Sequence, residues 1–163
     1  MNAHAVLRVA LAGADSISTS YLNDLSDADL LVRPVPGANH IAWQLGHLIA
    51  GENMMINETC PGSMPALPAG FAEKYSNDTA GSDDRGAFLS KDEYLRLYRQ
   101  QREATLKALD TLSEADFDRP APEQFRSFCP SVGAMFNTQA THWLMHAGQW
   151  AIVRRKLGHK PLF

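Results

Sequence analysis

Two histidines spaced four residues apart are the feature of this sequence best suited to chemistry. His142 and His146 lie in the stretch THWLMHAGQW, residues 141–150, which reads as helix. In a helix this spacing puts two imidazoles on one face, one turn apart, where both can reach a single metal ion. The pair therefore predicts part of a metal site. Taken alone, the same spacing is also typical of two helical histidines with ordinary hydrogen bonds.

The residues around the pair narrow its chemistry. Zinc proteases with the H-E-x-x-H motif carry their catalytic glutamate directly after the first histidine, where this chain has Trp143. A protease of that type is therefore excluded. Gln139 and Gln149 lie about one turn to either side of the pair on the same helix face. We expect these two amides to hydrogen-bond to the imidazoles and orient them.

A third ligand is expected from another helix. His47 lies near the middle of the helix predicted for residues 40–58, much as the pair lies near the middle of the one predicted for residues 131–157. If those helices are neighbours, three imidazoles converge on one divalent ion. Zn²⁺ and Ni²⁺ both suit imidazole ligands. Such an ion, with open positions, lowers the pKa of bound water to about 7 or deprotonates a bound thiol.

Other candidate ligands are less favoured. His40 lies about 10 Å from His47 along the helix axis, so we expect a helix-end histidine there. His4 and His159 are near the chain ends and are expected to be solvated. Glu52 is about 140° around the helix from His47, which places it outside the metal's coordination sphere. Gly51, one turn after His47, either leaves space for a substrate or allows close helix packing.

The two cysteines, Cys60 and Cys129, are each followed by proline in an expected loop. Neither belongs to a CxxC pair, and two cysteines do not make a disulfide framework. We expect free thiols, inert toward the metal, which agrees with a reducing compartment. A single disulfide between the two loops is the alternative.

Hydrophobic periodicity predicts an all-α protein, a four-helix bundle forming one domain over residues 1–163. The helices are predicted at residues 2–25, 40–58, 90–112 and 131–157. Asn39 and Ser131 are expected to cap the second and fourth helices, Ser90 and Glu93 match a capping box, and Gly158 suits a helix end. Between the second and third helices, the connection is far longer than an ordinary loop, so it is either a lid or a crossover along the bundle.

Composition excludes several classes of protein. Of 163 residues, 45% are hydrophobic and 20% charged, which is ordinary for a soluble globular domain. The net charge of -3, with dispersed basic residues, argues against nucleic-acid binding. No apolar run approaches the ~20 residues that cross a bilayer, and no basic leader precedes the first apolar stretch. We therefore expect a cytoplasmic protein with no membrane partner.

Two motifs together resemble those of the DinB/YfiT-like superfamily of metal-dependent enzymes. They are W-x-x-G-H-L at residues 43–48 and H-x-x-x-H-x-G-Q at residues 142–149. The resemblance implies an up-down-down-up four-helix bundle, often dimeric. It also implies a metal triad that maps onto His47, His142 and His146. The superfamily includes S-transferases and isomerases that use bacillithiol, mycothiol or glutathione, and no feature of this sequence selects one of these thiols.

Two functions follow from these observations. The favoured one is a metal-dependent enzyme, an S-transferase or a hydrolase, in which a small-molecule substrate or a low-molecular-weight thiol occupies an open position on Zn²⁺ or Ni²⁺. No separate general base is visible, so metal-bound water or thiol would be the reactive group. The alternative is a non-catalytic metal-binding or ligand-binding homodimer, related to stress. A fourth protein ligand would favour that alternative, because structural zinc sites are closed.

Overall fold

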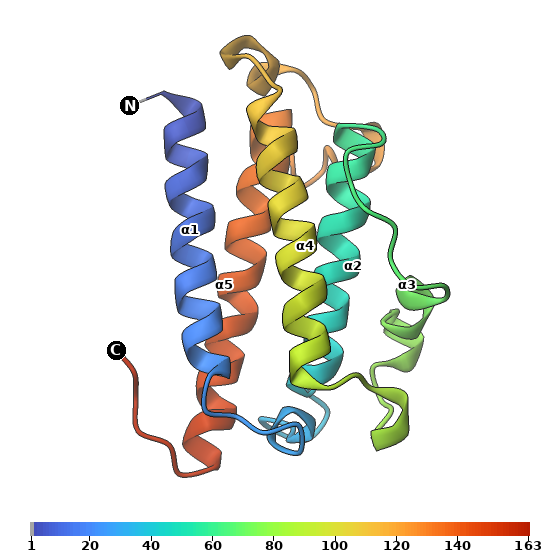
Figure 1. The fold of residues 1–163 in the computed structure, drawn as a ribbon, viewed down its shortest axis with the longest axis vertical. Helices are drawn as coiled ribbons and strands as arrows, with labels where there is room; N and C mark the ends of the chain where they lie inside the picture. Colours follow the sequence, from blue (N-terminus) through green and yellow to red (C-terminus); the bar gives the residue numbers. More distant parts are fainter. Residues whose placement is uncertain (1) are drawn as a thin grey trace.

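The computed structural model describes residues 2–163 and consists of four long helices joined by turns and short helices (Figure 1). The long helices are α1 (Ala3–Leu22), α2 (Ile41–Thr59), α4 (Lys91–Asp110) and α5 (Val132–Lys156). The connections hold α3 (Phe71–Lys74) and five 3-10 turns, η1 (Asp29–Leu31), η2 (Asn77–Thr79), η3 (Arg85–Ala87), η4 (Glu114–Asp118) and η5 (Glu123–Phe125). Over residues 2–163 there is no β-strand, and the predicted all-α bundle is confirmed.

The directions of the helices decide which side chains meet. In Figure 1, α1 and α5 run one way, while α2 and α4 run the other. Side-chain contacts agree, because Arg8 near the start of α1 pairs with Asp110 at the end of α4. Gln44 near the start of α2 likewise bonds Gln149 near the end of α5. With α2 and α5 antiparallel, the first half of α2 lies level with the second half of α5.

The helix ends lie within three residues of the predicted bounds, the largest difference being α1, which ends at Leu22 and not at Leu25; one predicted cap is corrected. Ser131 caps α5, Ser90 and Glu93 form the capping box of α4, and Gly158 has a positive φ of 85° just past α5. The cap of α2 is His40, and the prediction of Asn39 was wrong by one residue. The Nδ1 of His40 accepts the Trp43 amide at 3.1 Å, so an imidazole does what an asparagine side chain would do.

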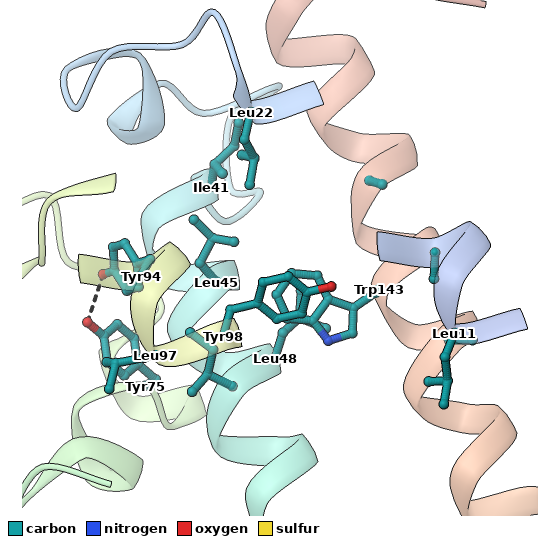
Figure 2. Packing of buried hydrophobic residues seen from close by; sticks show 14 of the residues in the cluster. Leu11, Leu22, Ile41, Leu45, Leu48, Tyr75, Tyr94, Leu97, Tyr98 and Trp143 are labelled. Atoms are coloured by element: carbon teal, nitrogen blue, oxygen red, sulfur yellow. Dashed lines mark hydrogen bonds between the residues drawn. The ribbon is translucent and has the colours of Figure 1, made fainter. Parts of the chain in front are cut away.

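The core is aromatic where α2, α4 and α5 meet. Figure 2 shows the ring of Tyr98 lying against Trp143, with their centroids 4.2 Å apart. In the same view, the hydroxyl groups of Tyr75 and Tyr94 share a hydrogen bond of 2.7 Å. Tyr75 reaches this position because Gly46 has no side chain, since a Cβ there would lie 2.2 Å from the Tyr75 ring. The long connection is thus fixed against α2 as a crossover (Figure 1).

A buried ion pair joins α2 to α4 at the bundle centre. The Glu52 carboxylate lies 3.2 Å from the Arg102 guanidinium, and both side chains are at most 5% exposed. The hydroxyl of Thr105 and the indole N–H of Trp143 also donate to this carboxylate, at 2.7 and 3.2 Å. Burial raises the pKa of Glu52, while Arg102 and both hydrogen bonds act in the opposite direction. The Glu52 carboxylate therefore joins α2 to α4 and α5.

Every helix in residues 2–163 is too short or too polar to span a membrane.

Candidate metal centre

The structure brings His47 of α2 together with His142 and His146 of α5. One ring nitrogen from each of the three lies within 4.8 Å of the others, and the Nε2 atoms of His142 and His146 are 3.2 Å apart. A tetrahedral ion bonded to imidazoles at 2.0–2.1 Å separates its ligand nitrogens by about 3.3 Å. The spacing within the pair fits a shared ion, and the cluster could hold one.

Gln44 fixes the orientation of this centre, a role that was not predicted from the sequence. Its Oε1 accepts the indole N–H of Trp150 at 2.8 Å, and an indole nitrogen can only donate. Its Nε2 donates to the carbonyl of Asn39 at 2.6 Å and to Oε1 of Gln149 at 3.1 Å. The amide of Gln44 can therefore face α5 in one way only, with its oxygen toward His146.

This arrangement settles the tautomer of His146. Its Nδ1 lies 2.8 Å from the Gln44 oxygen, which is an acceptor, so Nδ1 must carry the proton. A neutral imidazole then has its lone pair on Nε2, the atom that faces His142. Metal-binding histidines are commonly oriented by such a hydrogen bond on the distal nitrogen. The protein thus presents a metal-binding lone pair to the centre.

All three imidazoles are held in the neutral form. Burial, together with the neighbouring histidines, lowers the pKa of His142 to about 4 and that of His146 to about 3. Burial also lowers the pKa of His47, against a smaller opposing effect of the Tyr75 backbone carbonyl. Neutral imidazole is the form that binds metal. At neutral pH the cluster therefore offers lone pairs rather than positive charge.

The W-x-x-G-H-L motif has a structural explanation at this site. The ring of Trp43 stacks on His47 with a centroid distance of 4.9 Å and an interplanar angle of 10°. Gly46 admits the Tyr75 ring on the neighbouring face of α2. The motif thus places an aromatic wall beside the imidazole and limits its ring orientation.

Gln139 and Gln149, expected to hydrogen-bond to the imidazoles, both bond to other groups instead. Gln149 reaches His146 indirectly, through the amide of Gln44. The side chain of Gln139 donates to the carbonyl of Met135 at 2.9 Å and contacts the sulfur of Met55, without a hydrogen bond to an imidazole. Sequence periodicity gave the helix face correctly but could not show that the polar partner comes from α2.

The remaining histidines serve the fold. Besides capping α2, His40 places its Nε2 3.1 Å from the carbonyl of Ser82. His4 and His159, expected to be solvated, are only partly exposed and contact Glu114 and Asp24 at the bundle surface. His4 lies in the first turn of α1 beside the end of α4, and His159 follows α5 and reaches Asp24, just past the end of α1.

No cysteine or carboxylate joins the three histidines anywhere in residues 2–163. Cys60 and Cys129 are free, as predicted, and the thiol of buried Cys129 lies 3.0 Å from the hydroxyl of Thr138. Glu52 is occupied by its pairing with Arg102. Three protein ligands with no fourth are typical of an ion that retains an open position.

A cavity of about 640 Å³ opens beside His47 and His142. Its other walls are predominantly apolar and comprise Gly51, Met54, Met55, Phe125, Phe128, Thr138, Thr141 and Met145. A Cβ built at Gly51 would meet nothing within 4 Å, so this glycine leaves space rather than allowing close helix packing. The two phenylalanines come from the connection before α5, which was not predicted to contribute to the site.

The sequence profile described as the DinB superfamily matches residues 10–150, a range that includes every residue of the centre. Among curated proteins, none matches the chain significantly.

Proposed function

Because the chain belongs to the DinB superfamily, we propose that it is a metal-dependent enzyme whose divalent ion is held by His47, His142 and His146. The observation that carries this proposal is the hydrogen bond from Nδ1 of His146 to Gln44, which leaves Nε2 free to coordinate. Zn²⁺ and Ni²⁺ are the ions that best suit the three imidazoles.

The bound ion would supply a Lewis acid that activates water or a thiol near neutral pH. The chain's own residues have supporting roles. Gln44 holds the proton on the distal nitrogen of His146, and Trp43 covers one face of His47. No carboxylate lines the adjoining cavity, so the protein provides no separate general base there. The walls of the cavity would bind the substrate and limit the access of water to the ion.

Two reactions fit an open position beside such a cavity. One is transfer to the sulfur of a low-molecular-weight thiol, and the other is hydrolysis by activated water. A non-catalytic structural ion is the competing role, and it would normally have four protein ligands. The three-histidine cluster favours the catalytic role, because Glu52 is paired with Arg102 and both cysteines lie outside the cluster.

An activity comparison tests the proposal. Zinc-loaded and nickel-loaded proteins would be assayed with a model electrophile and several low-molecular-weight thiols, and separately with a panel of esters and amides. We expect turnover that requires the metal and is lost in His47→Ala. The matched control is His4→Ala, because His4 does not belong to the histidine cluster, and this variant should remain active. Absence of turnover in both assays would support the non-catalytic role.

A further inference from the structure

The cavity beside the three histidines has no charged side chain in its wall. Its polar groups are the two imidazoles, His47 and His142, and the hydroxyls of Thr138 and Thr141. The large apolar side chains of its wall are methionine and phenylalanine, and two of them, Phe128 and Met145, are each 60% exposed. A charged group buried among these residues would lose its hydration without gaining an ionic partner.

The histidine centre, unlike the cavity wall, favours a negatively charged group. Three neutral imidazoles leave the charge of a divalent ion uncompensated. Among residues 2–163 only Glu52 has a buried carboxylate, and it is already paired with Arg102. A ligand that approaches through the cavity is therefore favoured if the group facing the histidines is anionic.

From these two features we propose that the site takes a small amphiphile, with one anionic group at the histidines and an uncharged apolar body in the cavity. This inference rests on the proposed metal centre. It selects among the substrates considered above, because hydrophilic thiols with several charges would place unpaired charge against Met54, Phe125 and Phe128. An apolar thiol, or an acid bearing a hydrocarbon chain, has the required character.

Chain length should control the affinity of such ligands. Each methylene group that a ligand buries in the cavity should tighten its binding about fourfold. A straight-chain carboxylate has its charge at one end, so butanoate, hexanoate and octanoate form a series that varies the apolar body alone. Octanedioate has the length of octanoate but a second charge at the far end, which probes the absence of charged residues in the wall.

Gly51 allows the cavity to be filled without disturbing the fold. A leucine at this position extends into open space, and replacing glycine inside a helix favours the helix. Gly13 in α1 is the matched control, because it is exposed, helical and also has nothing within 4 Å of a built Cβ. Gly51→Leu and Gly13→Leu thus make the same chemical change inside and outside the cavity.

The experiment uses Co²⁺-loaded protein, whose visible spectrum reports a ligand arriving at the ion, with carboxylate affinities measured by titration. We expect about a fourfold gain in affinity for each methylene that the cavity covers, and octanedioate at least tenfold weaker than octanoate. Gly51→Leu should weaken octanoate at least tenfold, while Gly13→Leu leaves it unchanged. Equal affinities for butanoate and octanoate, or equal behaviour of the two leucine variants, would overturn the inference.

Failure of the metal centre gives a different result. If Co²⁺ does not bind, the proposed function fails, and calorimetry of octanoate with the metal-free protein still measures the contribution of the cavity. Chain-length dependence that Gly51→Leu removes would then support the apolar body alone and remove the anionic requirement. A spectrum that responds to all carboxylates equally would retain the metal centre and reject the substrate class.

Discussion

Gln44 of α2 and His146 of α5 are joined by a hydrogen bond of 2.8 Å that determines which imidazole nitrogen faces the other two histidines. The same oxygen accepts the Trp150 indole N–H at 2.8 Å. Because an indole cannot accept, the oxygen position is unambiguous, and His146 must donate through Nδ1. This contact links the packing of two helices to the chemistry of the centre.

Replacing Gln44 should therefore weaken metal binding without removing a ligand. We expect Gln44→Leu to lower the affinity by about 10- to 100-fold, as for other partners that orient a metal-binding histidine. Gln139→Leu is the control, since Gln139 is also buried but bonds to Met135. Competition with a chromophoric chelator gives both affinities. Equal affinities in the two variants would show that the Gln44 contact does not orient a ligand.

The Glu52–Arg102 pair should affect stability and leave the metal unaffected. Removing one partner of a buried ion pair costs about 3–5 kcal/mol, because the other charge stays buried. We expect Glu52→Gln to lower the free energy of unfolding by about 3 kcal/mol, within that range, since Asp15 still pairs with Arg102. Urea denaturation of the metal-free protein measures this. Loss of metal from Glu52→Gln would instead identify Glu52 as a ligand and favour a closed structural site.

The stability of the metal-free protein should fall as the solution becomes acidic. Burial lowers the pKa of His142 to about 4 and of His146 to about 3, whereas an unfolded histidine titrates near 6.5. Below about pH 6.5 these two histidines bind protons in the unfolded chain but not in the folded chain. The folded state therefore has its full stability above pH 6.5 and loses it progressively as the pH falls toward the folded pKa values of about 4 and about 3.

Denaturant titrations at pH 7.5, 6.0 and 5.0 test this pH dependence. The difference between wild type and His146→Gln isolates the contribution of one imidazole, since other titrating groups are common to both. We expect the variant to lose less stability than wild type between pH 7.5 and 5.0. Parallel pH profiles would mean that the imidazole is not buried in its neutral form.

We also expect a homodimer. On α5, Leu144 and Ile152 are 37% and 47% exposed, with the exposed Gly148 between them at four-residue spacing. An apolar stripe with a small central residue suits close packing against another helix. Sedimentation at micromolar concentration should show a dimer, and Ile152→Glu should shift it to monomer. A monomeric wild type would contradict this expectation.

The sequence predicted the bundle well because its signals are local. The capping box at Ser90, the cap at Ser131 and the glycine after α5 each depend on neighbours within a few residues, and all three are present. The Asn39 prediction failed by one residue because a histidine can accept the same backbone N–H. Periodicity specified a helix but not which of two adjacent polar residues caps it.

The centre was only partly predictable. The pair at His142 and His146 needs one helix, whereas adding His47 needs knowledge of which helices are neighbours, and the resemblance supplied it. The role of Gln44 depends on a contact 102 residues away in the chain. A weaker signal existed, since Gln44 lies three residues before His47 on the same helix face. The cavity walls from Phe125 and Phe128 depend on how a connection folds, which no local pattern shows.

Metal content of the purified protein is the most direct test of the shared ion. Wild type, His47→Ala, His142→Ala and His146→Ala would be measured together after limited dialysis, with His159→Ala as a control outside the cluster. We expect about one divalent ion per chain in wild type and in the control, and loss of most of it in each of the three variants. Full metal retention in all three would contradict it.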